Sequence, residues 1–463
     1  MAPAAGPAGG IHRRANIDSF RAHTTLRDSP EMSGLATLPQ PTHTSILRLK
    51  DVWLISAGHA MTHWYTATFY LLLPLIGTEL GLSYVQIGFI MTVQHAVGAA
   101  SNLPAGMLVD RYGNRGLMMA ASLFWVGFPY LMMGFTSTYW VLLACVTLVS
   151  IGNNIWHPTA ISTLAERYPA RKGVTLSVHG MGGNVGEAVA PLVVGALLAA
   201  FTWREVVMMN VVPGVFASLL ILAMLGALPT IRIERAQAPE PGRQPVPVGK
   251  AAADAAERPR WSDQLSEAAA LLRNRAMMLI CTSAAFRTMT QTGLLVFLPL
   301  YLTRELGYSI FATGVCLFVL QAAGFAASPI AGHLSDRMGR SRIVAGSMVM
   351  SAAVIGVMLL APGTFLFVVC TALLGFFLYA VRAVLQAWML DSTPASTAGS
   401  AVGIMFCTQA IGAAVAPLLA GWVADTWGLF AVFYFLAGTI VLANFFVFLM
   451  PRDLFGRQGG AAA

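Results

Sequence analysis

Three ionisable residues, Glu187, Arg287 and Arg382, lie inside long apolar stretches of this 463-residue chain. A charged side chain deep in a membrane costs roughly 2.5–3.5 kcal/mol on insertion scales, so we take all three as functional candidates. The structural alternative is a buried ion pair that only orders helices, or a position nearer a membrane face. As functional groups, a carboxyl group can carry a proton and guanidinium groups can bind an anion.

Glu187 is the expected proton carrier, because burial favours the neutral form of a carboxyl group and lets its protonation alternate near neutral pH. His157 titrates near neutrality without any shift. His59 and His63 do the same and stand four residues apart, on one helical face. The predicted proton-coupling set is therefore Glu187, His157, His59 and His63, against the alternative that each histidine only packs.

The two arginines fit an anionic substrate, since a guanidinium group offers a planar fork to phosphonate or carboxylate oxygens. Each has a glutamine four residues later in the sequence. Other polar side chains in apolar stretches could line the same cavity or form helix-to-helix hydrogen bonds. The predicted substrate-binding residues are Arg287, Arg382, Gln291, Gln386, Asn184, Asn153 and His95.

The composition excludes an ordinary soluble protein, because 57% of the residues are hydrophobic and only 10% are charged. So much apolar surface must be covered by lipid. A membrane helix needs roughly 20 apolar residues, and the chain holds twelve such runs. We predict an all-α membrane protein with spans at 52–78, 85–109, 116–136, 139–164, 173–201, 204–228, 276–302, 309–332, 342–361, 364–390, 398–423 and 428–450.

The net charge of +8 is distributed as in a membrane protein. Apart from Arg287 and Arg382 inside spans, and Arg204 and Arg304 in odd-numbered connections, every Lys and Arg lies in a terminal segment or an even-numbered connection. Under the positive-inside rule, this asymmetry predicts that both termini are cytoplasmic. It leaves no support for a nucleic-acid partner.

Segments poor in apolar residues divide the chain. We predict a disordered N-terminal tail, which Met32 would shorten if it were the true start, and a linker rich in Pro, Ala, Arg and Glu. The predicted parts are the tail 1–50, a six-helix bundle 51–228, the linker 229–275, a second six-helix bundle 276–450 and a C-terminal tail 451–463.

The sequence contains no motif that indicates a metal site, a cofactor site or a catalytic site. The five cysteines all fall in predicted spans without paired spacing, so neither a disulfide nor a metal site is predicted. No phosphate-binding Gly-x-x-x-x-Gly-Lys-Ser/Thr loop occurs, so no nucleotide is expected to drive the protein. No nucleophile and base set stands out, so we predict no enzyme.

The two predicted bundles repeat one sequence pattern at an offset of 226 residues. A glycine-framed charged turn, Gly106-Met-Leu-Val-Asp-Arg-Tyr-Gly-Asn-Arg115, returns as Gly332-His-Leu-Ser-Asp-Arg-Met-Gly339. Such a repeat indicates two pseudo-symmetric halves. The other pairs are Glu79/Glu305, Gly81/Gly307, Ser83/Ser309, Gly88/Gly314, Gly186/Gly412, Pro191/Pro417 and Gly195/Gly421, while Ala413 replaces the carboxylate of Glu187.

The repeated turn resembles the loop between the second and third helices of the major facilitator superfamily. The resemblance covers roughly residues 50–450 and implies two six-helix bundles around one central cavity. It also implies that the turn is cytoplasmic and forms a charge network that stabilises one alternating conformation. The implied gate residues are Gly106, Asp110, Arg111, Gly113, Arg115, Gly332, Asp336, Arg337 and Gly339.

Two further motifs resemble narrower branches of that superfamily. His157-Pro158 with the run His179-Gly-Met-Gly-Gly-Asn-Val-Gly186 is similar to the fosmidomycin-resistance branch. Gly186-x-x-x-Ala190-Pro191-x-x-x-Gly195 resembles the fifth-helix signature of drug/proton antiporters, and a basic residue in the seventh helix is found in related transporters, as Arg287 is here.

We therefore expect a secondary transporter that exports a small anionic compound, such as a phosphonate or a drug, in exchange for protons. It would act as a monomer in the bacterial inner membrane. The nearest alternative is proton-coupled uptake of an organic acid or other metabolite on the same fold. A non-transporting membrane receptor or scaffold is the alternative from another class.

Overall fold

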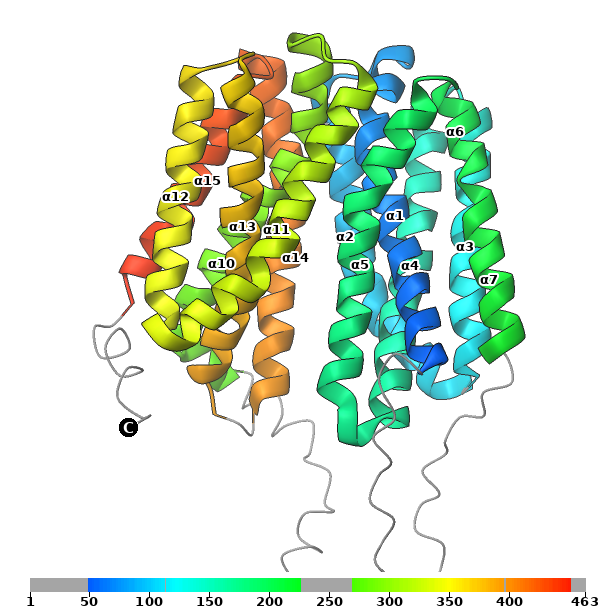
Figure 1. Ribbon diagram of the computed structural model, residues 1–463, viewed down its shortest axis with the longest axis horizontal. Coiled ribbons are helices and arrows are strands. Elements are labelled where there is room, and N and C mark those ends of the chain that lie inside the picture. The colour runs from blue at the N-terminus through cyan, green and yellow to red at the C-terminus, as the bar shows by residue number, and fades with distance from the viewer. Residues whose placement is uncertain (1–48, 113, 226–268, 395–396, 451–463) are drawn as a thin grey trace, which may run out of the picture. The chain divides into compact units, whose positions relative to one another are not determined.

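The computed structural model describes residues 49–112, 114–225, 269–394 and 397–450, all within the compact unit Ile46–Ala463. The predicted terminal tails and Met32 lie outside these residues, as does most of the predicted linker. The described helices are shown in Figure 1. They are α1 (Lys50–Glu79), α2 (Tyr84–Tyr112), α3 (Arg115–Phe135), α4 (Tyr139–Arg167), η2 (Pro169–Arg171), α5 (Lys172–Leu198), α6 (Trp203–Met209), α7 (Val211–Leu225), α10 (Arg275–Leu300), η3 (Tyr301–Glu305), α11 (Ile310–Met338), α12 (Arg340–Leu360), α13 (Phe365–Asp391), α14 (Ala398–Trp427) and α15 (Ala431–Phe448).

The helices follow the predicted apolar runs closely. One predicted span, 204–228, is divided at Asn210 into α6 and α7. Within the described ranges, nine helical segments are long and apolar enough to cross a membrane. The helices α1, α2 and α10 are equally long but carry more polar residues, several of them from the predicted sites. That these three helices also span the membrane, which would bring the number of spans to twelve, stays a prediction.

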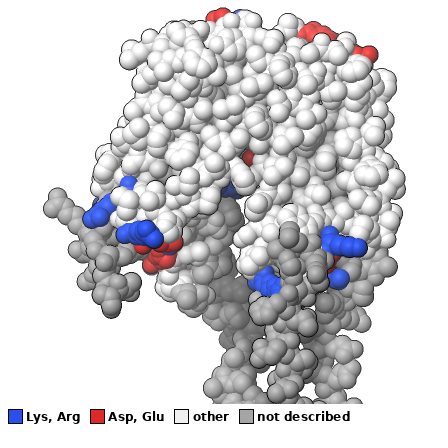
Figure 2. Space-filling view, viewed as in Figure 1, with Lys and Arg blue, Asp and Glu red and all other residues white. Residues whose placement is uncertain are grey.

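The surface of the helices is what lipid would cover. Large apolar side chains are widely exposed, including Leu360, Phe365 and Trp140. Figure 2 shows that charged side chains are scarce on the broad middle of the visible face and that Lys and Arg gather toward its bottom edge. The helix ends along that edge belong to the side of the molecule where α1 begins, which we call the N-terminal face (Figure 1). The opposite face is where α1 ends and α2 begins.

The sequence repeat is also a structural repeat. Gly81, after α1, and Gly307, after η3, adopt left-handed backbone angles of φ 61° and 65°, a region that favours glycine. Gly88 of α2 lies so close to α14 that an added Cβ would be 2.2 Å from the carbonyl oxygen of Pro417. Its counterpart Gly314 of α11 faces Pro191 of α5 in the same way, at 2.3 Å. The halves α1–α7 and α10–α15 thus contact each other reciprocally.

These contacts between the halves gather near the opposite face. Both oxygens of the Asp425 carboxylate, at the end of α14, accept hydrogen bonds from the first backbone amides of α2, those of Tyr84 and Val85. The Arg304 guanidinium group of the second half donates to the Pro74 carbonyl oxygen and the Thr78 hydroxyl group of α1. These contacts therefore join the halves at the end remote from the N-terminal face.

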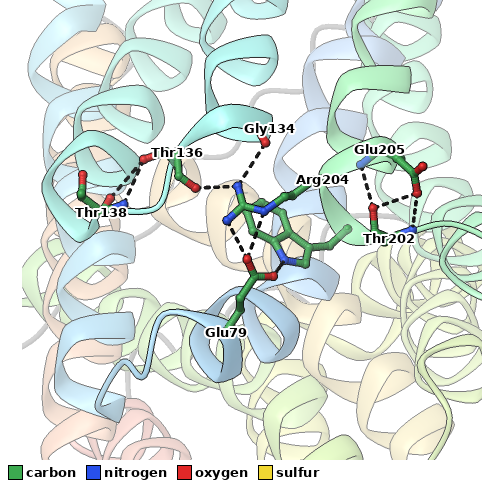
Figure 3. Close-up of polar contacts among 8 residues, drawn as sticks. Glu79, Gly134, Thr136, Thr138, Thr202, Arg204 and Glu205 are labelled. Carbon is green, nitrogen blue, oxygen red and sulfur yellow. Dashed lines mark hydrogen bonds and ion pairs between the residues drawn. The ribbon is translucent and has the colours of Figure 1, made fainter.

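A polar clamp holds the N-terminal half together at the same end (Figure 3). The Nε and Nη2 atoms of Arg204 donate to Oε1 of Glu79 at 3.0 and 2.6 Å. Its Nη1 atom donates to the carbonyl oxygens of Gly134 and Thr136. One guanidinium group thereby joins the end of α1, the end of α3 and the start of α6.

Glycines also set how closely α5 approaches α1. A Cβ on Gly182 would lie 2.2 Å from the Ser56 carbonyl oxygen, and one on Gly186 would lie 2.0 Å from that of Ala60. Small residues spaced four apart on one helix face allow such a close approach. It decides which side chains meet between the two helices.

Candidate functional site

His63 and Glu187 meet where α1 and α5 pack. The Nδ1 atom of His63 lies 2.7 Å from Oε1 of Glu187, and their side chains are 26% and 24% exposed. Gly183 makes room for this pair, because a Cβ there would lie within 3.0 Å of the His63 ring and 2.7 Å of the His59 ring. A carboxylate and an imidazole from distant parts of the chain thus share one hydrogen bond, and a proton can move between them.

Two further histidines complete a cluster around His59, which is 7% exposed. The Nδ1 atom of His59 lies 2.6 Å from the carbonyl oxygen of His179, and its Nε2 atom lies 3.3 Å from Nε2 of His157. The His157 Nδ1 atom contacts the carbonyl oxygen of Asn153 at 3.1 Å. The structure therefore brings together the whole predicted proton-coupling set, although its role stays a prediction.

His179 was not among the predicted site residues. Its ring stacks on that of His59, with centroids 3.9 Å apart. A usable signal was present, because His179 precedes Gly183 by four residues and therefore lies on the face of α5 that packs against α1.

Glu187 also reaches into the other half of the protein. Its Oε2 atom accepts a hydrogen bond from Nε2 of Gln321 on α11, at 3.4 Å. Gln321 was missed as well, although the 226-residue offset pairs it with His95, a predicted site residue. The carboxylate therefore bridges α1 of one half and α11 of the other.

The two predicted substrate-binding arginines differ in their surroundings. Arg287 of α10 is 2% exposed and donates from Nη2 to Gln291, four residues later in the same helix. Its Nε atom has no partner among the described residues. Arg382 of α13 is exposed, and its charge acts on Glu187 and on Arg287. Among the described residues we find no hydrogen bond or ion pair for it, so its guanidinium group can bind a ligand.

A polar cavity of about 250 Å³ lies beside this cluster. Buried polar atoms without a partner in the described structure belong to three lining residues: Oε1 of Gln94, Nε2 of His95 and Oδ1 of Asn153. Such atoms are stabilised by water or by a polar ligand. The cavity is lined by Thr62, His63, Thr66, Gln94, His95, Gly98, Ala99, Asn102, Ser150, Asn153, Asn154, His157, Ala410 and Ala413.

The broken symmetry of the repeat explains where the cavity lies. Glu187 and Gln321 contact each other, and their counterparts in the repeat, Ala413 and His95, both line the cavity. A small methyl group at 413 leaves space that a carboxylate fills in the other half. Four predicted site residues line the cavity, namely His63, His95, Asn153 and His157. Arg287, Gln291, Arg382, Gln386 and Asn184 are not among its lining residues.

The predicted gate residues lie at the N-terminal face. The side chains of Asp110 and Arg111 and all of Gly113 lie outside what the structure describes. Arg115 forms a bidentate ion pair with Glu166, and in the second half Arg340 pairs with Asp391. Asp336 also pairs with Arg340, whereas Arg337 is exposed. Gly339 has φ 96° and Gly332 and Gly106 face open space, so a gating role stays a prediction.

Comparison with known proteins gives the family context. The model of the Major Facilitator Superfamily matches residues 53–328 and 280–461. A probable sulfoacetate transporter of Cupriavidus necator is 24% identical over 81% of this chain and 87% of its own length. The phosphoglycerate transporter protein of Salmonella typhimurium is 23% identical, with 88% and 89% covered. The fold matches a bacterial homolog of the human lysosomal transporter Spinster with a TM-score of 0.71 and 17% identity, over 89% of this chain and 98% of that one.

The comparisons do not favour the fosmidomycin-resistance branch, which the sequence motifs suggested, over other branches of the superfamily. The fosmidomycin resistance protein of Escherichia coli is 22% identical over 79% of this chain and 85% of its own length. Because the sulfoacetate and phosphoglycerate proteins are at least as similar, the His157-Pro158 and His179–Gly186 motifs do not distinguish these branches. The relatives named here are transporters or a resistance protein.

Proposed function

Because the chain belongs to the Major Facilitator Superfamily, and is therefore a membrane transporter rather than an enzyme, we propose that it moves a small organic anion together with protons. In this proposal the two halves expose the central cavity first to one side of the membrane and then to the other. The observation that carries the proposal is the cavity between α1, α2, α4 and α14, where three buried polar atoms have no partner in the described part of the chain.

The positions of the contacts between the halves support alternating access. Gly88 and Gly314 let the halves touch near the opposite face, and Asp425 adds hydrogen bonds there. In this conformation the cavity would be reached from the N-terminal face. The cycle would break these contacts and form new ones at the N-terminal face, where the repeated Asp-Arg turns lie.

An anionic substrate is supported by Arg382. Its guanidinium group is exposed and its charge acts on both Glu187 and His157. A phosphate, sulfonate or carboxylate group could accept a bidentate pair of hydrogen bonds from it. The names of the sulfoacetate and phosphoglycerate relatives agree with a cargo of this class.

Proton coupling is supported by the position of Glu187. The carboxylate hydrogen-bonds to His63 in one half and to Gln321 in the other. Protonation would remove its negative charge and weaken both contacts, so the contact between the halves would change with the bound proton. This is the linkage that a proton-coupled transporter needs.

We propose export as the direction of transport and the bacterial inner membrane as its location. The clustering of basic residues at the N-terminal face agrees with a cytoplasmic position of that face. The named metabolite relatives favour one second candidate, which is proton-coupled uptake of a metabolite anion through the same residues. The protein would act as a monomer, since the cavity is formed within one chain.

Counterflow in proteoliposomes tests the proposal. The full-length protein is reconstituted, the vesicles are loaded with one organic anion, and entry of the labelled anion is followed for sulfonates, phosphate esters and carboxylates. We expect saturable exchange that requires the protein. Exchange of no anion, in vesicles whose protein is folded, would contradict transport and favour a receptor or scaffold. Growth of export-deficient and uptake-deficient strains carrying the protein then separates the two directions.

A further inference from the structure

Three histidine rings of the N-terminal half converge beside the cavity. His59 and His63 come from successive turns of α1, and His157 comes from α4. One ring nitrogen of each lies within 4.8 Å of those of the other two. Neighbouring turns of α1 and a distant turn of α4 thus bring three imidazoles together, and imidazole nitrogens are common ligands of transition-metal ions such as Zn²⁺.

The hydrogen bonds of the three rings decide which nitrogen is free. The Nδ1 atom of His59 contacts the carbonyl oxygen of His179, and that of His157 contacts the carbonyl oxygen of Asn153. A carbonyl oxygen only accepts, so each Nδ1 must carry the hydrogen. When Glu187 is ionised, the Nδ1 atom of His63 likewise donates to its carboxylate. With Nδ1 carrying the hydrogen, each ring in its neutral form keeps a lone pair on Nε2.

The Nε2 atoms that carry two of these lone pairs are close neighbours. The Nε2 atoms of His59 and His157 lie 3.3 Å apart. With both Nδ1 hydrogens held by carbonyl groups, two neutral rings would have no hydrogen to share between them. The two lone pairs would then repel each other, and a shared proton or a metal ion between the two Nε2 atoms removes this repulsion. Two Zn–N bonds of about 2.0–2.1 Å at a tetrahedral angle separate their nitrogens by about 3.3 Å, which matches the observed distance.

The surroundings are those of metal-binding histidines. Such ligands donate their second ring hydrogen to a carboxylate or a carbonyl oxygen, which fixes their orientation, and here all three do so. His63 and His157 line the cavity, so an ion could enter and keep a further position open to water or a ligand. The Glu187 carboxylate offsets the ion's charge, whereas Arg382, whose charge acts on His157, opposes it.

We propose that His59, His63 and His157 bind one divalent transition-metal ion of the Zn²⁺ class through their Nε2 atoms, with Glu187 as the carboxylate that orients His63. The site extends beyond the proposed transport function and does not depend on it. It also departs from the sequence analysis, which predicted no metal site, because cysteine spacing carries no information about histidines from different helices.

The test is equilibrium binding of Co²⁺, with Zn²⁺ as competitor, to the full-length protein in detergent. Tetrahedral Co²⁺ absorbs strongly in the visible range and so reports the geometry. The protein is purified without a histidine tag, and His12, His23 and His43 of the N-terminal segment are changed to Gln in the parent to remove other imidazoles. We expect one equivalent of Co²⁺ per chain with a tetrahedral spectrum, displaced by Zn²⁺.

Variants assign the ligands. His157→Ala should abolish the tetrahedral spectrum. Glu187 positions His63 without binding the ion, so Glu187→Gln should weaken Co²⁺ binding by about 10–100-fold. His333→Ala, an exposed histidine of α11, is the matched control and should bind like the parent. If the His157→Ala protein elutes as an aggregate in size-exclusion chromatography, His157→Asn and His63→Gln replace it in the same measurement. A parent that binds no Co²⁺, or a spectrum that persists in folded His157 variants, would overturn the proposal and leave a shared proton between His59 and His157.

Discussion

The Nδ1 atom of His63 lies 2.7 Å from the Oε1 atom of Glu187, although 124 residues separate them in the chain. The contact exists because Gly182 and Gly186 let α5 lie directly against the backbone of α1. The second carboxylate oxygen contacts Gln321 of the other half. One ionisable group therefore takes part in both the packing of the N-terminal half and the contact between the halves.

Replacing that carboxylate should separate proton movement from exchange. Glu187→Gln keeps an acceptor for His63 but cannot ionise, so we expect gradient-driven transport to fall by about tenfold or more. Counterflow, which needs no net proton movement, should be retained. Glu305→Gln, an exposed glutamate at the opposite face, is the control and should leave both assays unchanged. Equal loss of counterflow in the Glu187 variant would assign the residue to packing instead.

Arg382 should determine affinity for the anion. Removing a charge-assisted hydrogen bond typically costs about 1.5–3 kcal/mol, so Arg382→Ala should raise the half-saturating anion concentration about 10–100-fold. Arg382→Lys keeps the charge but not the planar fork, and we expect intermediate affinity. Concentration-dependent counterflow measures both. An unchanged affinity in the alanine variant would remove Arg382 from the binding site.

The contact between the halves should be sensitive to a single methyl group. Gly88→Ala and Gly314→Ala each place a Cβ against a proline carbonyl oxygen of the other half, and overpacking of this kind typically costs about 1–3 kcal/mol. We expect both variants to open the opposite face. Thr92 of α2 lies at this contact, because its hydroxyl group donates to the Ala414 carbonyl oxygen of α14. Faster labelling of Thr92→Cys, in a background without native cysteines, would report the opening. Gly346→Ala, which faces open space, is the control, and identical labelling in all variants would contradict the interface.

The polar clamp at the opposite face should contribute to stability. Arg204→Lys retains a charge near Glu79 but loses the fork that also reaches two backbone carbonyl oxygens. Since both side chains are partly exposed, we expect a loss of only about 1–2 kcal/mol, seen as a lower thermal unfolding midpoint in detergent. Arg342→Lys, at an exposed position in α12, should not change the midpoint.

The sequence predicted the helices well because long apolar runs and a repeated pattern both depend on local residue order. It did not predict the break between α6 and α7. There the Asn210 side chain accepts a hydrogen bond from Trp64, and its carbonyl oxygen accepts one from Tyr65, both of α1. Such a break depends on a neighbouring helix, which no local pattern reports.

The site was predictable only in part for the same reason. The pairing of Arg287 with Gln291 follows from a spacing of four residues within one helix. The meeting of His59 with His157 depends instead on how α1 and α4 are rotated toward each other. The repeat offset could have identified Gln321 through His95, because it relates positions across the two halves.

The most direct test of the account is whether a transported anion moves protons. Proteoliposomes containing the wild-type protein and an internal pH dye are given an anion that exchanges in counterflow, without any imposed gradient. We predict a substrate-dependent change of internal pH that is absent in Glu187→Gln vesicles with normal exchange. Anion movement by the wild-type protein without any proton movement would contradict the coupling assigned to Glu187 and His63.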